Sequence, residues 1–91
     1  MTQLFVRHSV ADFDKWYEIF GSEVSRRYQN AGGMTESVVY RSVDDPNEVT
    51  VVQTFESAEA AKSYFSMSGL GDRMAAAGVI GRPTIWIAEQ V

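Results

Sequence analysis

The chain begins with a segment in which apolar and polar side chains alternate. Over residues 3–10 the alternation places two sets of side chains on opposite faces, with Leu4, Val6, His8 and Val10 on one face and Phe5, Arg7 and Ser9 on the other. A period of two that includes β-branched residues predicts a β-strand. One face of this strand is apolar and carries a histidine, and the other is mixed and carries an arginine.

An apolar stripe with helical spacing follows this strand. Asp12 is a candidate N-cap, because its carboxylate can accept hydrogen bonds from the first backbone N–H groups of a helix. Up to the pair Gly32-Gly33 the pattern predicts one helix, with apolar residues every three or four positions at Phe13, Trp16, Phe20 and Val24. Gly21 lies inside this helix and weakens it by about 1 kcal/mol relative to alanine.

Strand and helix patterns alternate over the rest of the chain. They predict a hairpin of two strands over residues 34–43 and 48–56, followed by a helix over residues 58–67. A short helix over residues 72–77 and a last strand over residues 84–89 complete the chain. Asp-Asp-Pro-Asn forms the hairpin turn, and Ser57 is a candidate N-cap for the helix that follows. The candidate buried residues of that helix are Ala61, Tyr64, Phe65 and Met67.

The order β-α-β-β-α-β predicts a single ferredoxin-like α+β domain over residues 1–91. In this fold a four-stranded antiparallel sheet carries two helices on one face, so its other face is bare. By alternation the bare face carries Phe5, Arg7, Thr84, Trp86 and Ala88. Because an exposed face with Phe and Trp favours association, we expect a homodimer formed sheet against sheet that buries more than about 1,000 Å².

Composition narrows the function classes. The 91 residues include no cysteine and one histidine, which excludes disulfides and a multi-histidine zinc site within one subunit. The net charge of −4 argues against nucleic acid as a partner. No apolar run approaches the roughly 20 residues of a membrane span, and the N-terminus lacks the features of a signal peptide. We therefore expect a cytoplasmic protein that does not bind membranes.

Two local segments resemble a known family. The stretch Phe55-Glu56-Ser57-Ala58-Glu59-Ala60 is similar to the entry into the second helix of antibiotic-biosynthesis-monooxygenase-like proteins, within the dimeric α+β barrel superfamily. The opening from Phe5 to Trp16 resembles the start of small members. The resemblance implies two sheets that close into a barrel across a dimer, and a cavity for a small ligand. It further implies functions that include cofactor-free oxygenation of aromatic compounds, haem degradation and lactone isomerisation.

The chain differs from this pattern at one position. In many oxygenase-like and haem-degrading members, a histidine stands nine positions after the aromatic residue of this junction. Counted from Phe55, that position is Tyr64. Haem degradation is therefore not expected, and with one histidine and no cysteine in the chain we expect neither haem nor a metal, and no other cofactor.

The candidate catalytic residues are His8, Arg7 and Tyr64. His8 could act as a general base, Arg7 could bind a carboxylate or enolate, and Tyr64 could supply a hydroxyl. The candidate ligand-binding residues are aromatic or apolar, namely Trp86, Trp16, Phe5, Phe65 and Met67. Five of these residues have a structural alternative: His8, Trp16 and Tyr64 suit a packed core, and Arg7 with Trp86 suits a dimer interface.

Two functions remain open. The first is a dimeric barrel that binds a small, mostly apolar ligand and acts as a cofactor-free monooxygenase or isomerase. The second is a non-catalytic dimeric module whose barrel is filled by side chains. A cavity of roughly 300 Å³ or more favours the first. We expect its polar end where the first strand ends and the second helix begins, near His8 and Phe55.

Overall fold

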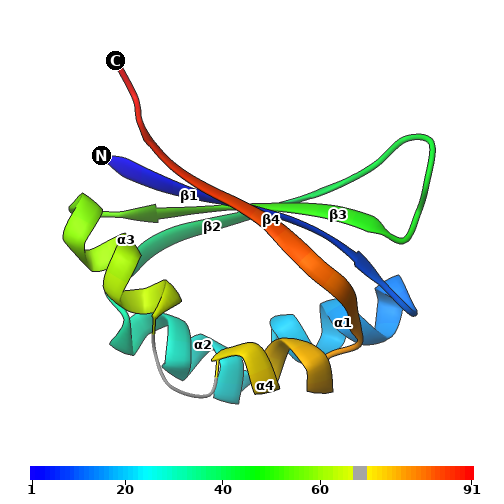
Figure 1. The fold of residues 1–91 in the computed structure, drawn as a ribbon. Helices are drawn as coiled ribbons and strands as arrows, with labels where there is room; N and C mark the ends of the chain where they lie inside the picture. The colour runs from blue at the N-terminus through cyan, green and yellow to red at the C-terminus, as the bar shows by residue number, and fades with distance from the viewer. Residues whose placement is uncertain (67–69) are drawn as a thin grey trace.

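The computed structural model describes residues 1–66 and 70–91, apart from the side chains at positions 24, 25, 28 and 70. The elements in chain order are β1 (Thr2–Val10), α1 (Phe13–Phe20), α2 (Glu23–Ala31), β2 (Met34–Arg41), β3 (Glu48–Phe55), α3 (Ala58–Phe65), α4 (Leu70–Ala76) and β4 (Val79–Glu89). The strands form a four-stranded antiparallel sheet in the order β2-β3-β1-β4. The described helices all lie on one face of this sheet (Figure 1), which confirms the predicted ferredoxin-like α+β fold. None of them is long and apolar enough to cross a membrane.

Both crossovers start at the N-caps that the sequence predicts. The Asp12 carboxylate accepts a hydrogen bond from the backbone N–H of Lys15 at 3.3 Å, and the Ser57 hydroxyl accepts one from Ala60 at 3.1 Å. Each bond satisfies an N–H group that has no partner within its own helix. α3 ends at Phe65, two residues before the predicted boundary, and Met67 lies outside the described residues.

The first crossover contains two helices, so the prediction of a single helix up to the glycine pair is wrong. The backbone N–H of Ser22 donates to the carbonyl of Ile19 at 3.1 Å, and such a tight i→i+3 bond closes α1. The carbonyl of Ser22 accepts from Arg26 at 2.9 Å and so starts α2. The low helix propensity of Gly21 explains why the chain breaks at this point.

The last strand starts five residues earlier than predicted, at Val79. Arg7 pairs with Thr84 and Ser9 pairs with Ile80, so three residues of β4 lie opposite the single residue His8. Gly81 has a φ of +71°, which a glycine adopts without strain. Pro83 is tolerated within the strand because β4 is an edge strand of the sheet.

The core lies between the sheet and the helices. Its buried apolar residues come mainly from the two central strands and from the helices above them: Leu4, Val6, Val10, Val49, Val51, Phe55, Trp16, Ala61 and Tyr64. The rings of Phe55 and Tyr64 pack with centroids 5.4 Å apart, which ties α3 to the end of β3. This contact accounts for the burial of Tyr64.

The opposite face of the sheet carries a row of apolar side chains across every strand. Val38 pairs with Val52, Val52 with Phe5, and Phe5 with Trp86. The Phe5 and Trp86 rings stack with centroids 5.1 Å apart and planes 3° apart. Trp86 is 44% exposed. Beside this row, Arg7 forms an ion pair with Glu48.

Gly32 allows the ring of Tyr64 to pack against the end of α2. A Cβ atom at Gly32 would lie 2.4 Å from Cδ1 of Tyr64, well inside van der Waals contact. We therefore predict that Gly32→Ala lowers the free energy of unfolding by about 1–3 kcal/mol, the range for overpacking a core. Urea unfolding followed by circular dichroism measures this change.

Gly71→Ala is the matched control, because a Cβ atom at Gly71 in α4 meets nothing within 4 Å. The control should be neutral or stabilising by up to about 1 kcal/mol, since alanine favours helix. Equal stability of the two variants would contradict the proposed contact between Gly32 and Tyr64.

Candidate functional site

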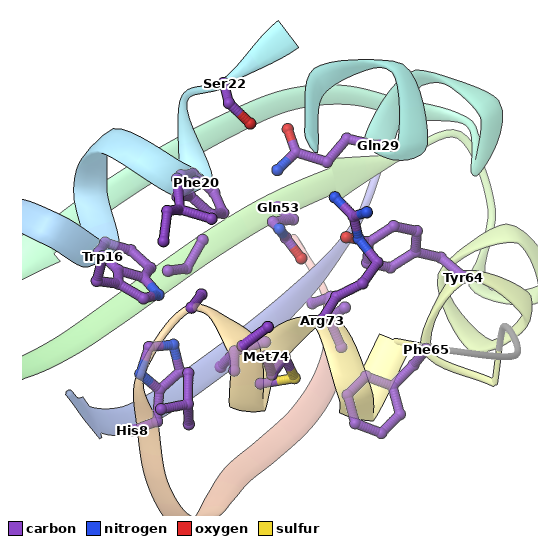
Figure 2. Close-up of a pocket in the computed structure, with 17 residues that line it drawn as sticks. His8, Trp16, Phe20, Ser22, Gln29, Gln53, Tyr64, Phe65, Arg73 and Met74 are labelled. Carbon is purple, nitrogen blue, oxygen red and sulfur yellow. The ribbon is translucent and has the colours of Figure 1, made fainter. Parts of the chain in front are cut away.

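A cavity of about 280 Å³ lies between the sheet and the helices. Its floor comes from β1 and β3, and its walls come from the helices and the start of β4 (Figure 2). Apolar side chains form most of the lining: Leu4, Val6, Trp16, Ile19, Phe20, Val51, Phe65, Met74, Ala76, Ala77 and Val79. The cavity therefore suits a small ligand with a largely apolar surface.

His8 places an imidazole at one end of this cavity. The residue is 6% exposed, and its ring forms a T-shaped contact with the ring of Trp16, with centroids 5.4 Å apart. In the described part of the chain, Nδ1 of His8 is buried and has no hydrogen-bond partner. Burial lowers the pKa of His8 from its usual value of 6.5, and an electrostatic contact with its own backbone opposes part of this effect. The site therefore holds a neutral imidazole with an available nitrogen.

Polar side chains from several elements meet at another part of the cavity. Figure 2 shows the guanidinium of Arg73 and the hydroxyl of Tyr64 pointing toward one another, with the amides of Gln53 and Gln29 close by in the view. These residues come from α4, α3, β3 and α2, and all of them line the cavity. Within the described residues, no group of His, Asp or Glu side chains could hold a metal ion.

The structure brings together some of the candidate site residues. His8, Tyr64, Trp16 and Phe65 all line the cavity. Arg7, Phe5 and Trp86 do not, because the alternation of β1 and β4 turns them to the face of the sheet away from the helices. Met67 lies outside the described residues.

The expectation that the polar end of the cavity lies near both His8 and Phe55 is wrong. β1 and β3 run antiparallel, so His8 pairs with Val49 at the start of β3, whereas Phe55 pairs with Thr2. Val49 and Phe55 lie six positions apart in β3, a distance of about 20 Å. His8 and the start of α3 therefore lie at opposite ends of the sheet, and Tyr64 contributes to the cavity because α3 folds back over the sheet.

The sequence pattern missed four polar residues of the cavity, Ser22, Gln29, Gln53 and Arg73. Gln53 carried a signal, because it occupies an inward position of β3 between Val51 and Phe55 and is only 4% exposed. A polar residue at a buried strand position indicates a polar site or a structural hydrogen bond. Arg73 carried no comparable signal, because the short α4 has no strong periodicity.

Neither the comparison with family models nor the comparison with curated proteins finds a match for this chain. The comparison with solved structures does find matches. A proposed antibiotic biosynthesis monooxygenase from Bordetella bronchiseptica has 13% sequence identity and a TM-score of 0.79, over 99% of this chain and 96% of that one.

Two further matches are oxygenases by name. The monooxygenase from the gene ActVA-Orf6 of Streptomyces coelicolor, in complex with nanaomycin D, has 17% identity and a TM-score of 0.76, over 99% of this chain and 87% of that one. SnoaB, a cofactor-independent oxygenase from Streptomyces nogalater, has 14% identity and a TM-score of 0.67, over 99% of this chain and 94% of that one. At such identities the similarity concerns the fold. The chain thus has the fold of the antibiotic-biosynthesis-monooxygenase-like proteins, as its sequence resemblance predicts.

Proposed function

We propose that this protein binds a small, mostly apolar aromatic molecule in the cavity and oxygenates it without a cofactor, with His8 as the general base. One observation carries the proposal: a buried imidazole with an unpartnered Nδ1 lines an otherwise largely apolar cavity, within the residues described. Burying a polar atom without a hydrogen bond costs free energy, so a ligand that supplies the partner is favoured. The names of the oxygenases with this fold add support.

A neutral imidazole is suited to remove a proton from an enolisable substrate. Because burial lowers the pKa of His8, the ring stays neutral near pH 7 and can accept a proton at Nδ1. The substrate carbanion then reacts with dioxygen. In the overall reaction a CH₂ carbon loses two hydrogens, one oxygen atom becomes its carbonyl oxygen, and the other leaves as water. An isomerase would instead return the proton to a different carbon of the same substrate.

Dithranol tests this proposal, because its CH₂ group is acidified by the ring system and it consumes dioxygen on oxidation. We predict that the wild-type protein accelerates oxygen uptake by dithranol, and that His8→Ala lowers kcat by about 10²–10⁴-fold, the usual contribution of a general base. An oxygen electrode measures the rate above the uncatalysed background.

Tyr40→Phe is the control, because Tyr40 is exposed on β2. Its rate should equal that of the wild type. An equal rate for His8→Ala, with folding intact, would remove His8 from the reaction. If the wild-type protein neither binds dithranol nor accelerates its oxidation, the alternative of a non-catalytic module is favoured.

The buried imidazole also predicts how stability depends on pH. The folded-state pKa of His8 lies below 6.5, so below that pH the unfolded chain binds more protons than the folded one. Protonation therefore favours unfolding, and His8 contributes a loss of stability as the pH falls below about 6.5, with no effect well above it. Between about pH 7.5 and about pH 5.5, Tm should fall more for the wild type than for His8→Gln. Parallel Tm curves for the two proteins would contradict this assignment.

We propose in addition that the bare face of the sheet joins two copies of this chain. The apolar row formed by Val38, Val52, Phe5 and Trp86 crosses the whole sheet, and no helix of the described chain covers it. A second copy offers the same row, and two such faces can pack sheet against sheet. A domain of this size gains much of its burial from such a partner.

Trp86→Glu tests the association, because it places a charge within the apolar row of the proposed interface. We expect the wild type to sediment as a dimer at tens of micromolar and Trp86→Glu to sediment as a monomer. Val43→Glu is the control, because Val43 is 99% exposed in the β2–β3 turn and lies outside the row. A monomeric wild-type protein at this concentration would refute the dimer.

A further inference from the structure

The cavity has one cationic side chain and no anionic one among its described lining residues. Arg73 lies on α4, is half-buried, and points into the cavity (Figure 2). The described lining contains no Asp or Glu side chain. In a cavity with mostly apolar walls a positive charge is weakly screened, so it favours an anionic group of the ligand.

The groups around Arg73 add hydrogen-bonding capacity at the same place. Tyr64 is 6% exposed, Gln53 is 4% exposed, and Gln29 lines the cavity from α2. Hydroxyl and amide groups donate hydrogen bonds to oxygen atoms, and a guanidinium offers two parallel N–H donors to a carboxylate. Four elements of the fold therefore supply donors to one part of the cavity.

We infer that Arg73, with Tyr64, Gln53 and Gln29, binds a carboxylate of the ligand while His8 faces the group that loses a proton. This inference rests on the proposed function and names its substrate class, an aromatic monoacid. The acid group sits at Arg73, and the acidic C–H or O–H group sits at His8.

The register of the sheet sets the length of this ligand. Gln53 pairs with Leu4, and His8 lies four residues further along β1, so about 13 Å of strand separates the two positions. The side chains of His8 and Arg73 both reach into the cavity and shorten this span. A one- or two-ring aromatic acid with its ionisable group on the far side from the carboxylate fits between them.

Two probes of the same ring system test the inference. The first is 6-hydroxy-2-naphthoate, which carries a hydroxyl and a carboxylate at opposite ends, and the second is β-naphthol, which lacks the carboxylate. We expect the wild-type protein to bind the hydroxy acid at least about tenfold more tightly than β-naphthol, as a charge-assisted bidentate contact allows. Isothermal titration calorimetry measures both Kd values, and circular dichroism checks that each variant is folded.

Arg73→Gln should abolish the preference for the acid while leaving the Kd of β-naphthol within about twofold, because only the charged contact is lost. Arg73→Lys should restore part of the preference through its charge. Arg26→Gln, on an exposed position of α2, is the matched control and should behave as the wild type.

The outcomes separate this inference from the proposed function. The carboxylate site is wrong if Arg73→Gln keeps the preference for the acid, or if the wild-type protein shows no such preference. The proposed function still stands in that case, provided that β-naphthol binds the wild-type protein and that His8→Ala weakens this binding. If neither probe binds the wild-type protein, the carboxylate site is wrong, and oxygen uptake with dithranol then decides the proposed function separately.

Discussion

The structure depends on the burial of β1 between two neighbouring strands. This strand pairs with β3 on one side and β4 on the other, and its inward residues Leu4 and Val10 are almost completely buried. Because side chains alternate along a strand, burial of one face fixes the direction of every residue. His8 is thereby held under the helices, and Phe5 and Arg7 are held on the opposite face. A shift of one residue in register would exchange these positions and place the imidazole in solvent.

The cavity exists because the helices do not fill the whole space above this face. The first crossover is divided at Gly21 and Ser22, and α3 is anchored to β3 through Tyr64 and Phe55. The space between these helices and α4 is lined by large apolar side chains that pack only in part. A polar group in such a space has a large energetic weight, because water and counter-ions screen it poorly. In the proposed site, His8 and Arg73 therefore carry more energetic weight than the charges on the surface.

Stability and the proposed function make opposite demands on His8. A buried nitrogen without a hydrogen-bond partner costs the folded state free energy. In the proposed reaction, the same nitrogen accepts the proton of the substrate. The aromatic contacts of Trp16 offset part of this cost, because the rings of Phe13, Phe20 and His8 pack against its indole ring. These aromatic contacts stabilise the folded state and also hold the imidazole of His8 in place.

The sequence by itself determined the parts of the molecule that depend on local periodicity. Alternation located β1 and the inward direction of His8, the caps Asp12 and Ser57 located the starts of α1 and α3, and the order of the elements specified the fold. The tertiary structure decided which distant residues share the cavity. Arg73 lines the same cavity as Gln53 and Tyr64 only because α4 packs over the sheet, and antiparallel pairing separates His8 from the end of β3. No short-range pattern encodes these contacts, since they result from the packing of helices onto the sheet and from the register between its strands.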